Sequence, residues 1–73
     1  MAIQIVMDHT GDSRHYFEPG EARTVKQAEQ RFRELTEAGF TAAVRSGPGQ
    51  TSQLRSFDPT AEETVFFPRL VGG

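Results

Sequence analysis

Hydrophobic and polar residues follow different periods along this chain, and the period changes from one segment to the next. Residues 2–7 are apolar except at one position and rich in β-branched side chains, a pattern that predicts a strand. Turn-forming residues follow at 10–13, and a short aromatic strand is predicted at 14–18. These two strands and the turn between them are expected to form a β-hairpin. Pro19 and the glycine after it end the hairpin.

The central segment carries the clearest local signal, and that signal is helical. Thr24 is followed three residues later by Gln27, the spacing of a capping box. Apolar residues then recur at helical spacing: Val25, Ala28, Phe32 and Leu35. This pattern predicts a helix over residues 25–38, with Gly39 as the left-handed residue that ends it.

The segment after the helix predicts three more strands, separated by breaks. The first two are expected at residues 41–45 and 53–57, and the last begins at residues 65–67 and runs through Pro68. Residues 47–49, Gly-Pro-Gly, form the first break. Asp58 begins the second and is expected to cap a single helical turn over 60–63. Pro68 cannot donate a ladder hydrogen bond, so it belongs at a sheet edge or where the last strand leaves the sheet.

This order of elements predicts an α+β fold in two layers, with a mixed sheet of four to five strands covered on one face by the single helix. Within the first strand, Ile3, Ile5 and Met7 share one face. We expect the following residues to form the interface between helix and sheet: Val25, Phe32, Leu35, Ile3 and Ile5. In the last strand Phe66 is expected to point inward, which places Phe67 outward beside the end of the chain.

Composition narrows the class of protein. The chain has 73 residues, of which 36% are hydrophobic and 25% charged, which indicates one small soluble domain. It has no cysteine, so it offers no disulfide and no thiolate, and it suits a reducing cytoplasm. Residues 1–5 resemble neither a signal peptide nor a membrane span. The net charge of −2, with interspersed signs, predicts no nucleic-acid partner.

The residue types used in catalysis do not combine into an enzyme site. His9 and His15 flank the predicted hairpin turn, but two histidines without a suitably spaced carboxylate pair do not predict a metal site. The glycines at 47–49 lack the lysine of a phosphate-binding loop. We therefore expect no catalytic residues, no metal and no bound cofactor.

The end of the chain is the most informative feature. Gly72 and Gly73 have no role in folding, because glycine weakens a regular element by about 0.5–1 kcal/mol relative to alanine. Without a Cβ, such a segment can enter a narrow channel as extended backbone with a free carboxylate at its tip. The alternative interpretation is a terminus without a function.

The order of elements resembles the β-grasp fold of ubiquitin and of the bacterial sulfur carriers of the MoaD and ThiS type. The last five residues, Arg69-Leu70-Val71-Gly72-Gly73, are similar to the Arg-Leu-Arg-Gly-Gly end of ubiquitin. Phe66-Phe67-Pro68 lies as far from the terminus as the Phe-Phe-Pro of the small subunit of molybdopterin synthase. The resemblance covers the whole chain in topology but only the last eight residues in motif. Val71 departs from it, because ubiquitin has arginine there, and the loop at 9–12 matches neither relative.

This resemblance implies a ubiquitin-like β-grasp domain over residues 1–68 and a flexible tail over 69–73. It implies that an E1-like adenylating enzyme uses ATP and magnesium to activate the carboxylate of Gly73, so that the domain is a substrate and not an enzyme. Arg69, Leu70 and Val71 would dock on that enzyme together with Phe67.

Two routes follow from the shared activation step. In the first, the protein is a ubiquitin-like modifier that is transferred to target proteins, with an E2-like conjugating enzyme and a JAB-type peptidase as further partners. In the second, the carboxylate becomes a thiocarboxylate and the protein is a sulfur carrier. Arg69 and Leu70 favour the modifier, since they match the residues that ubiquitin presents to its activating enzyme. A third interpretation is a plain protein-interaction module, and in each case we expect a cytoplasmic monomer without a membrane partner.

Overall fold

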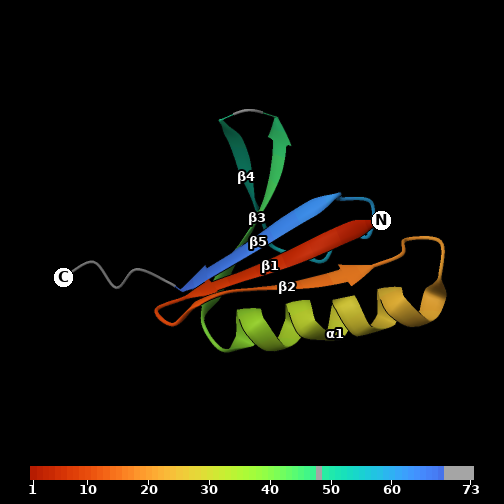
Figure 1. The fold of residues 1–73 in the computed structure, drawn as a ribbon, viewed down its shortest axis with the longest axis horizontal. Helices are drawn as coiled ribbons and strands as arrows, with labels where there is room; N and C mark the ends of the chain where they lie inside the picture. Colours follow the sequence, from red (N-terminus) through yellow and green to blue (C-terminus); the bar gives the residue numbers. More distant parts are fainter. Residues whose placement is uncertain (48, 69–73) are drawn as a thin grey trace.

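The computed structural model describes residues 1–47 and 49–68, which form five strands and one helix (Figure 1). In chain order the elements are β1 (Ala2–Asp8), β2 (Gly11–Phe17), α1 (Ala22–Glu37), β3 (Phe40–Gly47), β4 (Gln50–Leu54) and β5 (Glu63–Pro68). The strands form one sheet in the order β2-β1-β5-β3-β4, in which β1 and β5 are parallel and the other neighbours antiparallel. The predicted α+β class is confirmed, and the layout is consistent with a β-grasp.

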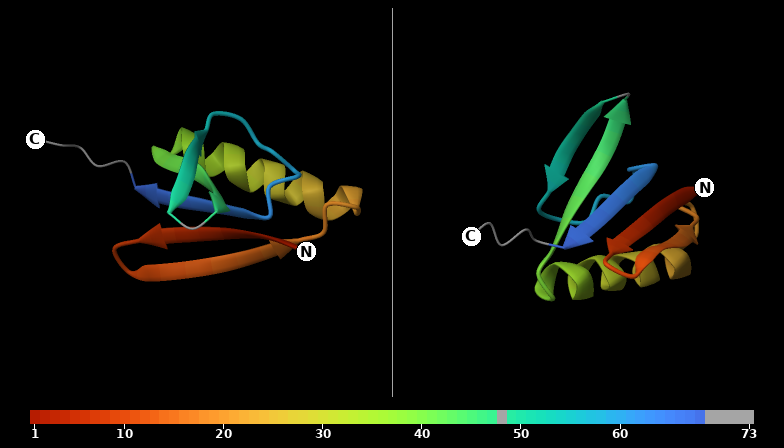
Figure 2. Two further views of the ribbon diagram at one scale, coloured as in Figure 1. Left: turned by 90° about the horizontal axis from the view of Figure 1, so that it is seen from above. Right: turned by 60° about the vertical axis from the view of Figure 1, so that its left-hand side comes forward.

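The helix lies on one face of the sheet and leaves the other face uncovered. Figure 2 shows α1 beneath the strands in one view and behind them in the other, while the far end of the β3–β4 hairpin extends away from the helix. The helix α1, in the described part of the chain, is not long and apolar enough to cross a membrane. The other face of the sheet, the open face, is covered by no helix or strand of the described residues.

The helix begins at Ala22, three residues before the predicted start. Glu21 is the N-cap, and its side chain makes no capping hydrogen bond. The Thr24 hydroxyl instead accepts a hydrogen bond from the Glu18 N–H at 3.0 Å and lies 2.8 Å from the Glu18 carbonyl oxygen. The capping box of Thr24 and Gln27 was a wrong prediction, because the turn before the helix folds Glu18 back onto its first turn.

The end of the helix follows the prediction closely. The N–H of Ala38 donates to the Glu34 carbonyl at 3.0 Å, and the N–H of Gly39 donates to the Thr36 carbonyl at 3.2 Å. Gly39 has a φ of 103°, in the left-handed region that favours glycine. This conformation turns the chain directly into β3.

The face of β1 that packs beneath α1 is the opposite of the predicted one. Ala2, Gln4 and Val6 are buried beneath the helix, and Gln4 has an exposed fraction of 0%. Because successive side chains of a strand point to opposite faces, Ile3 and Ile5 belong to the open face. Both faces of this strand are largely apolar, so the alternation alone did not identify the face that meets the helix.

Gln4 is accommodated in the core because α1 supplies both of its hydrogen-bond partners. Its Nε2 donates to the carbonyl oxygen of Ala28 at 3.0 Å. Its Oε1 accepts a hydrogen bond from Nη1 of Arg31, also at 3.0 Å. A buried amide is stable only when its polar atoms are paired in this way.

Aromatic rings join the helix to the sheet in the apolar part of the core. The Phe32 ring lies edge-on to that of Phe66, with 5.6 Å between ring centroids, and edge-on to that of Phe57 at 6.0 Å. Phe57 also contacts Phe17 at 5.9 Å and so connects the two buried clusters of the core. The prediction that Val25, Phe32 and Leu35 face the sheet is correct, although Ile3 and Ile5 are not their partners.

The segment between β4 and β5 differs from the prediction in two ways. β4 spans Gln50–Leu54, not 53–57, and Phe57 leaves the sheet to fill the core beside α1. Residues 58–61 form a turn instead of a helical turn: Asp58 Oδ1 accepts a hydrogen bond from the Thr60 N–H at 2.9 Å. Packing of the partly buried Phe57 ring against Phe32 and Phe17 explains why β4 ends before residue 57.

Candidate functional site

Five of the predicted site residues lie outside the described part of the chain: Arg69, Leu70, Val71, Gly72 and Gly73. Phe67, the sixth, is described. Its exposed fraction is 38%, whereas that of Phe66 is 0%, so the predicted alternation of inward Phe66 and outward Phe67 is confirmed. Phe67 is therefore the one predicted docking residue whose surroundings the structure describes.

The last described residue of the chain, Pro68, lies at the end of the central strand β5. β5 lies between β1 and β3, and its last residue, Pro68, is aligned with Phe40 at the start of β3. Figure 1 shows this end of β5 on the same side of the molecule as the β1–β2 turn and the end of α1. Pro68 is thus the last described residue of β5, and because β5 lies between β1 and β3 it is not on an edge strand.

The open face of the sheet carries a continuous group of apolar side chains that reaches this point. We call this group the apolar patch, and it consists of Ile3, Ile5 and Met7 of β1, Tyr16 of β2, and Val65 and Phe67 of β5. The register places Ile3 beside Tyr16 and Ile5 beside Val65. Met7 and Tyr16 are the most exposed members of this group, with exposed fractions of 45% and 59%, and contiguous exposed apolar side chains are a feature of many contact surfaces.

Sequence reasoning found only Phe67 of this patch. The alternating apolar residues of β1 were recognised, but they were assigned to the core. The sequence correctly predicts Tyr16 in a strand but does not indicate on which face of the sheet its side chain lies. The signal that could have located the patch is Gln4, because its two helix partners fix the orientation of the whole strand.

Two ion pairs flank the patch on the open face. Arg14 of β2 is aligned with Ile5, and its Nε lies 3.7 Å from Oδ2 of Asp12. Arg45 of β3 lies on the other side, with its Nε 3.5 Å from Oε2 of Glu63. Each pair consists of one cation and one anion, so the margins of the patch carry no net charge.

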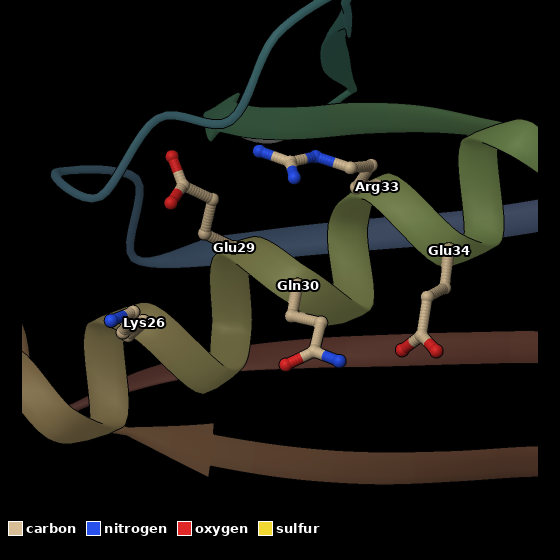
Figure 3. A pocket seen from close by; sticks show the side chains of 5 residues that line it. All are labelled: Lys26, Glu29, Gln30, Arg33 and Glu34. Atoms are coloured by element: carbon tan, nitrogen blue, oxygen red, sulfur yellow. The ribbon is translucent and has the colours of Figure 1, made fainter.

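The outer face of α1 offers no comparable surface. Figure 3 shows a shallow hollow there, lined by Lys26, Glu29, Gln30, Arg33 and Glu34, whose side chains spread around a single helix. These side chains are all polar and of both charge signs. The hollow is a gap between solvated side chains and has no second element to close it.

Among the titratable groups of the described residues, His15 has a shifted pKa on the helix side of the sheet. The pKa of His15 lies below its ordinary value of 6.5, first because the ring is partly buried and second because Arg31 is near. No group of three His, Asp or Glu side chains within residues 1–47 and 49–68 is arranged to hold a metal ion. The apolar patch is therefore the feature of the described residues from which a function can be argued.

Comparison with protein-family models, with curated proteins and with solved structures finds no match to this chain.

Proposed function

We propose that this domain is a ubiquitin-like protein modifier, activated at the carboxylate of Gly73 and transferred to target proteins. One observation supports this most: the apolar patch extends along β1 and β5 to Phe67, next to the start of the segment that ends in Gly72-Gly73. A partner that held the patch would therefore also be close to the C-terminal carboxylate.

The chemistry of activation belongs to the partner enzyme. A carboxylate oxygen of Gly73 attacks the α-phosphorus of ATP, pyrophosphate leaves, and the resulting acyl adenylate has AMP as a good leaving group. An enzyme thiol then attacks the acyl carbon and AMP departs, and finally a target amine displaces the thiol and loses a proton. The domain contributes a rigid docking surface and two glycines that have no side chains to obstruct a narrow channel.

The sulfur carrier remains a second candidate because of Phe66-Phe67-Pro68. Phe66 is buried in the core, Phe67 is outward, and Pro68 ends the strand, so the motif anchors the end of β5. This arrangement serves a thiocarboxylate carrier equally well. In that route sulfur replaces one oxygen of the activated Gly73 carboxylate, with AMP as the leaving group.

The experiment that tests the proposal is activation by the cognate adenylating enzyme. The domain is incubated with this enzyme, ATP and magnesium, and pyrophosphate release and intact mass are measured. We expect an adenylate or an enzyme adduct that disappears when Gly73 is deleted. Adduct formation by the truncated domain would refute activation at Gly73.

Products formed in cells distinguish the two routes. A tagged domain is expressed together with its neighbouring genes, purified under denaturing and reducing conditions, and digested. Tail remnants on lysines of other proteins support the modifier. A terminal mass increase equal to the difference between sulfur and oxygen, without any remnants, would establish the carrier instead.

The contribution of the patch is tested separately. Phe67→Ser should raise the half-saturation concentration for adenylation several-fold, since it removes an apolar contact beside the tail. Gln30→Ser, on the exposed outer face of α1, is the matched control and should leave it unchanged. A plain interaction module would show no adenylation and would keep its binding activity after deletion of Gly72 and Gly73.

A further inference from the structure

The two edge strands of the sheet differ in charge. β2 and β4 are the first and last strands in the order β2-β1-β5-β3-β4. No strand within residues 1–47 and 49–68 pairs with the outer side of either one, so each edge presents a row of backbone N–H and C=O groups to its surroundings. β2 contains Asp12, Arg14 and His15, whereas none of the five residues of β4 is charged.

β4 lacks the features by which edge strands usually avoid pairing with another strand. Those features are a charged side chain, a proline or a bulge in the edge strand. The residues of β4 are Gln-Thr-Ser-Gln-Leu, the first four of them exposed, and the irregularity in its pairing with β3 adds a residue to β3, between Arg45 and Gly47. Figures 1 and 2 show the β3–β4 hairpin extending away from α1, so the helix leaves this edge accessible.

The sequence of β4 is compatible with pairing to a second copy of itself. Two identical strands pair antiparallel about a two-fold axis perpendicular to the sheet, which places one residue opposite itself. A register centred on Ser52 uses all five residues and places Thr51 opposite Gln53. These side chains can hydrogen-bond across the strands and so add to the main-chain hydrogen bonds. Arg55, the nearest cation in the chain, is then aligned with Gly49, which has no side chain.

The same operation gives the opposite result for β2. A register that uses all seven of its residues is centred on Arg14 and places the guanidinium groups of the two copies directly opposite each other. Like charges in this position destabilise a strand pair. Of the two edges, β4 is therefore the one suited to a second copy of the chain.

The side chains of β4 favour a second copy over a strand from another protein. A domain that selects a foreign strand recognises its side chains through pockets or charges beside the edge. Gln50, Thr51, Ser52 and Gln53 are neutral, polar and exposed, and these four residues supply neither a pocket nor a charge. Their own sequence, in contrast, supplies a matching partner at each position.

We propose that two copies of this domain associate through their β4 strands and form one continuous sheet. The inference is independent of the activation of Gly73, and it departs from the monomer expected from the sequence. Because the two-fold axis is perpendicular to the sheet, both helices lie on one side of the dimer and both apolar patches on the other. Five residues from each copy form a small interface, so the dimer is weak and forms at about 0.1–1 mM.

The concentration dependence of the full chain tests the association. Sedimentation equilibrium and amide spectra are recorded between about 10 µM and about 2 mM. We expect the mass to rise toward twice that of the monomer and the amide signals of Gln50–Leu54 to shift. Ser52→Lys places two ammonium groups opposite each other and should raise the dissociation constant about tenfold or more. Ser13→Lys, the same change at an exposed serine of the other edge strand, is the matched control and should leave it unchanged.

Cysteine variants test the register and do not depend on the folding of a lysine variant. The chain has no cysteine, so Ser52→Cys and Ser13→Cys each carry a single thiol. Directly opposite residues have Cα atoms about 4.5–5.5 Å apart, which is within the range that a disulfide spans. With oxidised glutathione, we expect Ser52→Cys to form a disulfide-linked dimer about tenfold faster than Ser13→Cys at equal concentration.

Three results would overturn the inference. One is a wild type that stays monomeric up to the highest concentration, which would leave the β4 edge to a strand from another protein. Another is equal cross-linking of Ser52→Cys and Ser13→Cys. The third is a set of concentration-dependent shifts at Met7, Tyr16 and Phe67 in place of β4, which would assign self-association to the apolar patch.

Discussion

The buried glutamine of β1 leads to the sharpest prediction about stability. Gln4→Ala removes an amide that donates to the Ala28 carbonyl and accepts a hydrogen bond from Arg31, both at 3.0 Å. Because these two contacts connect β1 to α1, their loss should weaken the packing of the helix on the sheet. The exposed fraction of Gln4 is 0%, so water cannot replace these two hydrogen-bond partners in the folded protein.

The magnitude follows from the contacts that are lost. The neutral hydrogen bond to Ala28 contributes about 0.5–1.5 kcal/mol, and the charge-assisted bond from Arg31 contributes about 1.5–3 kcal/mol. Each buried methylene adds about 0.8 kcal/mol. Arg31 is only partly buried and regains water after the change, which favours the lower end of its range. We expect a loss of about 3 kcal/mol, comparable with the whole stability of a domain of this size.

The assay is urea unfolding followed by far-ultraviolet circular dichroism, which needs no tryptophan. A sucrose-containing buffer keeps the weakest variants folded, because an excluded osmolyte favours the compact state. A double-mutant cycle with Gln4→Ala and Arg31→Ala isolates the pair. We expect a coupling free energy of about 1–2 kcal/mol.

Two results would refute this reasoning. An additive cycle, within about 0.5 kcal/mol, would show that Arg31 and Gln4 act independently. A Gln4→Leu variant as stable as the wild type would show that the amide contributes nothing beyond its volume. Buried polar groups are sometimes replaced by apolar ones without loss, so this second result is a real test.

Three further changes test the core, the titration of His15 and the helix end. Phe32→Ala should cost about 3–5 kcal/mol, because it removes both edge-on aromatic contacts, and should abolish the dispersed amide spectrum in nuclear magnetic resonance. The lowered pKa of His15 means that the unfolded chain binds protons first, so thermal stability should fall as the pH drops below about 6.5, and His15→Gln should flatten this slope; equal slopes would contradict it. Gly39→Ala should lower the free energy of unfolding by about 1 kcal/mol, since φ is 103° there, and an unchanged urea midpoint would count against this.

Local sequence patterns correctly predicted those features that depend only on residues close together in the sequence. The helical spacing of Val25, Phe32 and Leu35 identified the face of α1 that packs on the sheet. Gly39 correctly predicted the end of the helix, because glycine has no Cβ and adopts a positive φ without steric cost. The alternation of Phe66 and Phe67 followed from strand geometry alone.

Element boundaries were less well predicted where a distant residue competes with the local preference. Thr24 has the spacing of a capping residue, but the turn before α1 brings Glu18 within hydrogen-bond distance of its hydroxyl. Phe57 has a strand-like sequence around it, but its ring packs against Phe32 and Phe17. In both cases a contact made by folding outweighs a local propensity of a few tenths of a kcal/mol.

The sequence by itself determined the order of the elements, the two sets of alternating side chains in β1 and β5, and the apolar face of the helix. Only the tertiary structure decided which face of β1 lies beneath α1. The period of two separates Ala2, Gln4 and Val6 from Ile3, Ile5 and Met7 but assigns neither set to the core. That assignment depends on Ala28 and Arg31, which lie 24 and 27 residues from Gln4 and satisfy its amide only after the helix has docked. The apolar patch is exposed because this distant pairing holds the larger side chains of β1 on the open face.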